Sequence, residues 1–408
     1  MFKLFLVIFF SLLVPSQFVY ADVLGTLQKS WDSTKDAIGE VINTEVIVEI
    51  PKKEIKIELS RDRALEIWDD LKDKFDDIKE LKSKRNQAPD ESIFGKTKRD
   101  YDEKIESIFK ILSVITNDPQ IVKDRSTLEK LKSKIESSEL KSADLKTKAQ
   151  LATGKDKEKL IDRSNSHQTD INEYNDSRNE LLFNVQNRLE AYGLSLDTDQ
   201  VKVLLSRVDA DDIIGMTTSF SVIAELTQQF SEATLASGEN LQIAKNYYFM
   251  HVILLELQMH IQRNYIDRLK NVYLVKLGNL KRENGSLIFK TKSLVSSSEG
   301  SYQKIYEQNL KSQQFTRKVL VLYEKILRKD LKKIENGLKK VNDNFLVALN
   351  TYETVNVSAD LAKLMAGNNN LFNEVMSLQT PELIPFENLE IQDAFETLSL
   401  QLSDSIDS

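Results

Sequence analysis

The chain has 408 residues, of which 41% are hydrophobic and 29% are charged. This composition is too apolar for a wholly disordered chain and suits a folded, helix-rich protein. A formal net charge of −7 argues against nucleic acid as the main partner, because phosphate binding needs a surplus of Lys and Arg on one face. With only 12 Gly and 6 Pro, the sequence favours long uninterrupted helices.

The first 21 residues have the three parts of a secretory signal peptide. Lys3 gives a positive start, residues 4–14 are apolar, and Val19 and Ala21 occupy the −3 and −1 positions of a cleavage site. The apolar run is too short to cross roughly 30 Å of hydrocarbon as an anchor. The chain also lacks cysteine, which is unusual for secreted animal proteins. We therefore expect a bacterial protein, periplasmic or secreted, whose signal peptide is removed.

Residues 22–60 read as an N-terminal helix followed by a strand-like linker. Apolar residues at helical spacing predict a short amphipathic helix over 22–43, and apolar and polar residues alternate over 46–59. Two short strands around a turn fit that alternation, but a hairpin alone is marginally stable in water. We assign the stretch to a linker with strand tendency.

Residues 61–192 predict a coiled-coil helical arm. Apolar residues alternate at spacings of three and four, first in a helix capped by Ser60, then over 100–115, 125–152 and 155–192. The Pro-containing stretches 88–90 and 117–119 separate the first three helices. The break at Thr153 and Gly154 either reverses the chain or lies within a longer rod. Narrow apolar seams with charged flanks are typical of coiled coils.

Residues 193–380 predict a helical bundle around an apolar helix over 240–280. Tyr192 and Gly193 indicate a helix end, and Asp197 or Thr198 starts the next helix. The segment 247–257 is apolar on most of its circumference, so other helices must surround it. We expect this helix to end at Asn284 and Gly285 and a further turn within 296–301.

The seam is regular over 313–355, where the solvent side is basic, and the charge then reverses. After Lys363 the chain has no Lys or Arg, and residues 381–408 form an acidic tail that is either docked onto the basic helix or free to bind another protein. The candidate partner-binding residues come from a short apolar face of this tail, from its acidic side chains and from the basic helix. They are Phe395, Leu398, Leu402, Glu390, Glu396, Arg328, Lys329, Lys332 and Lys333.

No motif predicts catalysis, a cofactor or a metal. Asp209, Asp211 and Asp212 resemble the start of a calcium loop, but Ile214 and Phe220 stand where Gly and Glu are required, so we interpret the carboxylates as helix-capping groups. His251 and His260 are nine residues apart, on different faces of one helix, and we expect structural histidines. No small-molecule substrate is evident either.

These observations predict an all-α protein, an elongated helical bundle with long antiparallel coiled-coil helices. We expect an exported, non-enzymatic accessory component of a bacterial cell-envelope assembly that binds protein partners or itself through its helices. Contact with a membrane surface stays open. The alternative is a secreted membrane-active protein of the α-helical pore-forming type, which would release the apolar segment 247–257 at a membrane.

Overall fold

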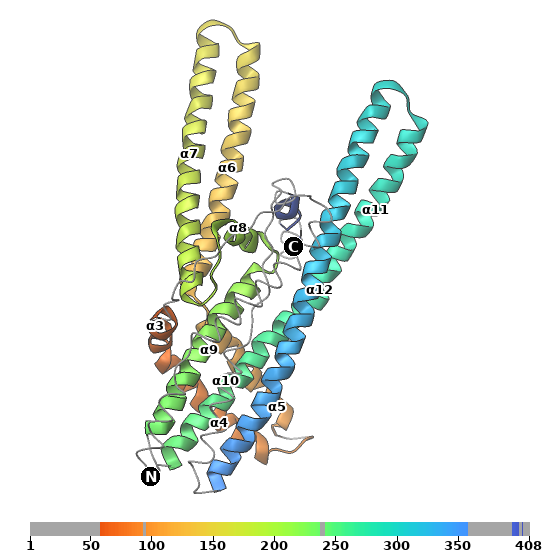
Figure 1. Cartoon of the computed structure of the whole chain (residues 1–408). Helices are drawn as coiled ribbons and strands as arrows, with labels where there is room; N and C mark the ends of the chain where they lie inside the picture. Colours follow the sequence, from red (N-terminus) through yellow and green to blue (C-terminus); the bar gives the residue numbers. More distant parts are fainter. Residues whose placement is uncertain (1–57, 93–94, 237–240, 358–393, 400–401, 403–408) are drawn as a thin grey trace, which may run out of the picture.

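The computed structural model describes residues 58–92, 95–236, 241–357, 394–399 and 402, and this part of the chain is all-α (Figure 1). No strand occurs in these ranges, and the predicted fold class is confirmed. The predicted signal peptide, the helix over 22–43 and most of the strand-like stretch lie outside the described residues. Leu59, expected in that stretch, is helical.

Three helices at the N-terminal side pack into the body, namely α3 (Glu58–Glu66), α4 (Trp68–Gln87) and α5 (Lys98–Ile115). The predicted stop after α4 is confirmed, with Ala88 extended in front of Pro89. Ser60 was predicted to cap a helix, but α3 begins two residues earlier. The Ser60 side chain is buried, with its Oγ 2.5 Å from the Oγ of Ser221 on α9, so its polarity serves helix packing.

The long helices α6 (Pro119–Leu151) and α7 (Gly154–Ala191) form an antiparallel hairpin, reversed at Gly154 with φ +57°. Helix α6 begins at Pro119, earlier than the predicted residue 125. The reason is that Asp118 caps it, accepting from the N–H groups of Gln120 and Ile121 at 2.8 and 3.0 Å, while proline suits the first helical position.

The centre of the body contains α8 (Thr198–Ser206), α9 (Ala210–Ala236) and α10 (Leu241–Arg268). The end of α7 at Tyr192 and Gly193 is confirmed, since Gly193 has φ +86° and Leu194 N–H donates to the Leu189 carbonyl at 2.8 Å. Asp197 caps α8 as predicted. The segment 247–257 of α10 packs among α9, α12 and α5 and is almost entirely buried, which confirms its central position.

The predicted helix end at Asn284 and Gly285 is wrong. A five-residue π-helical turn, Leu269–Tyr273, joins α10 directly to α11 (Leu274–Ser297). Asn284 is buried and Gly285 lies inside α11. A glycine within a helix costs only about 1 kcal/mol, and the packing of α11 along α12 offsets that cost.

Helix α12 (Gly300–Val357) has 58 residues and starts 13 residues before Gln313, where the regular apolar seam begins. The turn expected within 296–301 is present, with Gly300 at φ +65°. Helix α12 packs along both α11 and α10, so it runs from the tip of one hairpin to the opposite end of the body (Figure 1).

Two hairpins, α6–α7 and α11–α12, project from a shared body and diverge like the arms of a V (Figure 1). The predicted arm, 61–192, included α3, α4 and α5. In the structure α3 packs on α9 and α5 on α10, so the projecting part of that range is the α6–α7 hairpin alone.

Candidate interaction site

The helical residues 394–399 lie between α6 and α12 near the fork of the V (Figure 1). Phe395, Leu398 and Leu402 are buried. The ring centroid of Phe395 is 4.2 Å from that of Tyr323 on α12, and Glu396 pairs with Lys132 on α6 at 2.5 Å. The sequence predicts that the acidic tail either docks onto the basic helix or is free to bind another protein. Residues 394–399 are docked onto that helix, and they contact its buried face and not its basic, solvent-exposed face.

Tyr323 connects this docked segment to the centre of the body. Its hydroxyl oxygen accepts from Ser399 Oγ at 3.1 Å and from the backbone N–H of Val208 at 2.8 Å. Val208 lies in the short connection between α8 and α9. One fully buried side chain thus joins the C-terminal segment, α12 and the α8–α9 connection.

A buried ion cluster lies next to Tyr323. Arg207 donates two hydrogen bonds to Asp209, each 2.8 Å, and one to Asp330 on α12 at 2.5 Å. Tyr265 on α10 donates to Asp209 at 2.8 Å. All three charged residues are at most 2% exposed, and such groups are stable in a protein interior only when paired. The cluster therefore ties α8, α9, α10 and α12 together.

The cluster contains one more carboxylate than cations. Burial opposes the charge of Arg207, but Asp209 and Asp330 hold its pKa well above the ordinary value. Burial raises the pKa of Asp330 to about 6 against the pull of Arg207, and the charge of Asp209 adds to the rise. The arrangement stabilises an interface between helices.

The stretch 209–212 starts a helix, as predicted, because α9 begins at Ala210. Its carboxylates bind side chains on other helices, and their role as capping groups stays a prediction. Asp212 accepts from Tyr273 Oη at 2.7 Å and pairs with Arg268 at 2.9 Å, and Asp211 pairs with Arg125 of α6. These contacts join α9 to α10, to the π-helical turn and to the base of the α6–α7 hairpin.

A second polar cluster fixes the base of the α6–α7 hairpin. Besides capping α6, the fully buried carboxylate of Asp118 accepts from Arg188 at 2.5 Å and from Tyr192 Oη at 2.8 Å. Burial opposes ionisation of Asp118, but the hydrogen bonds from Arg188, Ile121 N–H and Tyr192 hold its pKa below the ordinary value. The start of α6 and the end of α7 therefore meet at one carboxylate.

The histidines on α10 are buried, as predicted. His260 stacks on Phe109 with ring centroids 5.8 Å apart, and its Nδ1 is 3.1 Å from Glu106. His251 has no hydrogen-bond partner for either ring nitrogen within the described ranges, and burial lowers its pKa to about 4. In the part of the chain described, no group of three His, Cys, Asp or Glu is placed to hold a metal ion.

The other candidate residues stay on the surface of α12. Arg328, Lys329 and Lys332 are exposed and Lys333 is half-buried. Arg328 pairs with Glu324 one turn away at 2.7 Å, a contact of small energetic weight at a surface. Glu390 lies outside the described residues. Whether any of these residues contacts a partner stays a prediction.

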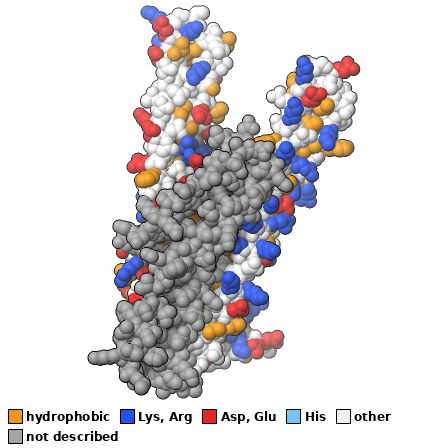
Figure 2. Space-filling model, viewed as in Figure 1, with side chains coloured by type: hydrophobic (Ala, Val, Ile, Leu, Met, Phe, Trp, Pro, Cys, Tyr) orange, Lys and Arg blue, Asp and Glu red, His pale blue; other side chains and the backbone are white. Residues whose placement is uncertain are grey.

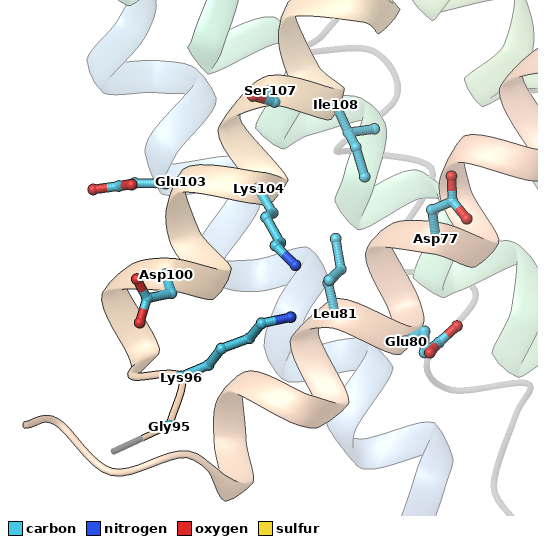
Figure 3. A pocket seen from close by; sticks show the side chains of 10 residues that line it. All are labelled: Asp77, Glu80, Leu81, Gly95, Lys96, Asp100, Glu103, Lys104, Ser107 and Ile108. Carbon is cyan, nitrogen blue, oxygen red and sulfur yellow. The ribbon is translucent and has the colours of Figure 1, made fainter. Parts of the chain in front are cut away.

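An open groove lies between α4 and α5 (Figure 3). The Lys96 and Lys104 side chains point toward one another across it, and the close approach of Lys96 lowers the pKa of Lys104. Carboxylates of Asp77, Glu80 and Glu103 also line the groove. Charges of both signs on an open surface give it no clear ligand preference.

Comparison with protein families, curated proteins and solved structures found no match for this chain. Among the described helices, none is both long and apolar enough to cross a membrane.

Sequence reasoning missed the two polar clusters. The spacing of threes and fours over 313–355 predicts Leu331 in the apolar seam, but Asp330 is the buried residue at that level and Leu331 is half-buried. The usable signal was a charged residue between Leu327 and Ile334, where the regular spacing of the seam demands a buried side chain. Nothing in the sequence identified its partner, because Arg207 lies 123 residues away.

Proposed function

We propose that this protein is an exported, non-enzymatic interaction protein that serves as an accessory component of a bacterial cell-envelope assembly. The observation that carries the proposal is the pair of helical hairpins that project from one body (Figure 1). Long hairpins of this kind hold side chains far from the body, which suits contact with another protein better than enclosure of a substrate.

Each hairpin exposes large apolar side chains in its outer half. Leu140 and Leu151 on α6 are 73% and 86% exposed, and Phe289 on α11 and Tyr302 on α12 are 79% and 69% exposed. Single exposed apolar residues are common on protein surfaces. Their position on projecting helices makes them suitable anchors for a partner helix.

The C-terminal segment remains a second proposed contact. Because Phe395, Leu398 and Leu402 are buried against the body, a partner would have to displace the segment to reach these side chains. Binding there would therefore compete with the contact between Phe395 and Tyr323. We rank the hairpin surfaces first for this reason.

The test is crosslinked recovery of partners from the native cell envelope with the mature chain. A variant with Leu140→Glu and Leu151→Glu is expected to lose a specific partner, because a charge replaces each apolar anchor. The matched control, Ser133→Glu with Thr147→Glu, adds the same charge at exposed positions of α6 and should retain it. Failure of the unaltered chain to recover any specific protein would contradict the proposal.

The pore-forming alternative has a separate outcome. It requires the segment 247–257 to leave the core, where Ile253 is fully buried. Dye release from liposomes by the unaltered chain, abolished by Ile253→Asp without loss of the α6–α7 hairpin, would favour that function over a scaffold.

A further inference from the structure

The outer face of α12 carries a lysine at every seventh residue over 36 residues. We call this set the α12 lysine row. It consists of Lys304, Lys311, Lys318, Lys325, Lys332 and Lys339. All six residues are exposed, and none forms an ion pair or hydrogen bond with any residue in the described ranges. Figure 2 shows Lys and Arg side chains repeated along the edge of the molecule that α12 forms.

The row lies opposite the face that holds α12 in the protein. A buried residue also recurs every seven positions, five residues before each lysine from Lys325 onward. These buried residues are Leu320, Leu327 and Ile334. In a heptad with its seam at the first and fourth places, the sixth place lies farthest from the neighbouring helix. The lysines therefore contribute nothing to packing, and the fold requires no cation at these positions.

The same heptad place on α6 shows that a long hairpin helix does not need lysine there. Its seam includes Ile121, Leu128 and Ile135, and the sixth-place residues are exposed. They are Ser126, Ser133, Leu140 and Thr147. The range 274–357, which covers α11 and α12, contains 16 Lys or Arg and 8 Asp or Glu. The range 119–191, which covers α6 and α7, contains 14 Lys or Arg and 13 Asp or Glu. The positive charge is thus concentrated on one hairpin of a chain whose net charge is negative.

The spacing suits an extended planar anion. Seven residues rise by about 10.5 Å, so the row covers roughly 50 Å along one helix, and neighbouring ammonium groups lie about one Debye length apart. Their mutual repulsion is therefore small. Three acidic residues lie one helical turn from lysines of the row. Glu307 accepts from Gln303 at 3.1 Å and Glu335 pairs with Lys270 at 2.5 Å, while Asp343 is exposed four residues after Lys339.

We propose that the α12 lysine row is a docking surface for an anionic lipid bilayer. A straight line of cations meets a flat bilayer along its whole length, whereas the backbones of duplex DNA curve away from a straight rod. Val321 beside the row and Leu346, the next sixth-place residue, are 49% and 55% exposed, and apolar side chains suit a lipid interface better than a phosphate backbone. Contact is electrostatic and peripheral, because the apolar face of α12 stays in the core.

Docking along α12 goes beyond binding of a protein partner. The α6–α7 hairpin diverges from α12 (Figure 1), so a molecule lying on a bilayer through α12 keeps that hairpin free for a protein. Because the whole chain carries a net charge of −7, a bilayer repels most of its surface, and binding requires the row to face the lipid.

The test is cosedimentation of the mature full chain with vesicles of phosphatidylglycerol and phosphatidylcholine, with phosphatidylcholine alone as the neutral comparison. Each lysine near an anionic bilayer strengthens partitioning by about fivefold, so Lys318→Gln, Lys325→Gln and Lys332→Gln together should weaken it on the order of a hundredfold. Glutamine keeps a good helix propensity, and circular dichroism verifies the fold. The matched control replaces Lys130, Lys141 and Lys146, three exposed lysines of α6, by Gln.

The proposal expects binding to the anionic vesicles only, its loss in high salt, and retention of binding by the control variant. Absence of binding by the unaltered chain overturns it, as does equal weakening in both variants or equal binding to neutral vesicles. Binding to duplex DNA or to an acidic protein, with no binding to vesicles, would assign the row to a different partner and overturn it as well. These readouts do not depend on recovery of a protein partner.

Discussion

The two projecting hairpins share one geometry but are attached to the body in different ways. Both ends of the α6–α7 hairpin stop at its base, where Pro119 starts one helix and Gly193 ends the other, and the polar cluster of Asp118 lies at that point. The α11–α12 hairpin has no such base. Its helices continue into the core through the π-helical turn and through the unbroken α12.

This difference indicates different stabilities. Opening the α6–α7 hairpin requires loss of contacts at one end and of a narrow seam that includes Ser138 and Ser142. Separating α11 from α12 requires disruption of the helices that form the core. One hairpin is therefore an attached unit, and the other is an extension of the body.

The largest expected effect on stability comes from breaking the buried ion cluster in the core, into which the α11–α12 hairpin continues. Arg207→Met leaves Asp209 and Asp330 buried without their cation, and breaking a buried pair in this way costs about 3–5 kcal/mol. Urea unfolding followed by circular dichroism should show that loss over the whole molecule. Arg328→Met, which removes an exposed pair of one helical turn, is the control and should change stability by less than about 0.5 kcal/mol. Similar effects of the two substitutions would contradict the assigned role of the cluster.

Acidification should weaken the core through His251. Its pKa of about 4 in the folded protein lies below the ordinary value of 6.5, so the unfolded chain binds more protons between these values. The contribution of neutral His251 to the free energy of unfolding is therefore complete above pH 6.5. It is lost as the pH falls toward 4, by roughly 3 kcal/mol in total.

The raised pKa values of Asp212 and Asp330, each about 6, act in the opposite sense below pH 6, so a comparison of two proteins is required. The unaltered chain should lose more stability between pH 7 and pH 4.5 than His251→Met. Equal losses would mean that His251 is hydrated or paired in solution.

At the base of the attached hairpin, Asp118→Ala removes the cap of α6 and the partner of Arg188 and Tyr192. We expect the free energy of unfolding to fall by about 2–3 kcal/mol. Loss of the helix cap accounts for roughly 1 kcal/mol of this, and the donors left without their acceptor account for the remainder. Limited proteolysis should then cut α6 and α7 before α12. Uniform sensitivity along the chain would argue against a separable hairpin.

The smallest effect on stability is expected for a serine pair in the seam between α6 and α7. Ser142 and Ser164 face one another with their Oγ atoms 2.9 Å apart, both buried. Replacing both by Ala removes donor and acceptor together and should change stability by less than about 0.5 kcal/mol, whereas either single Ala should cost about 1 kcal/mol. Thermal unfolding of the three variants tests this, and a large loss in the double variant would show a specific role for the pair.

Local patterns allowed prediction of the helices, because heptad spacing, proline stops and glycine ends act over a few residues. The end of α7 at Gly193 and the capping of α8 by Asp197 are such cases. The prediction failed at Gly285, where packing of α11 on α12 outweighs a weak local preference. It also failed to find the Arg207 cluster, since partners on different helices depend on tertiary packing.

The central structural claim is that the two hairpins differ in their attachment, and native-state hydrogen exchange of the full chain tests it most directly. The account predicts that amides of α6 and α7 exchange through an opening of lower free energy than amides of α12 over 320–341, and that Asp118→Ala lowers protection in the first set only. Equal protection of the two hairpins, lowered together by that substitution, would contradict it.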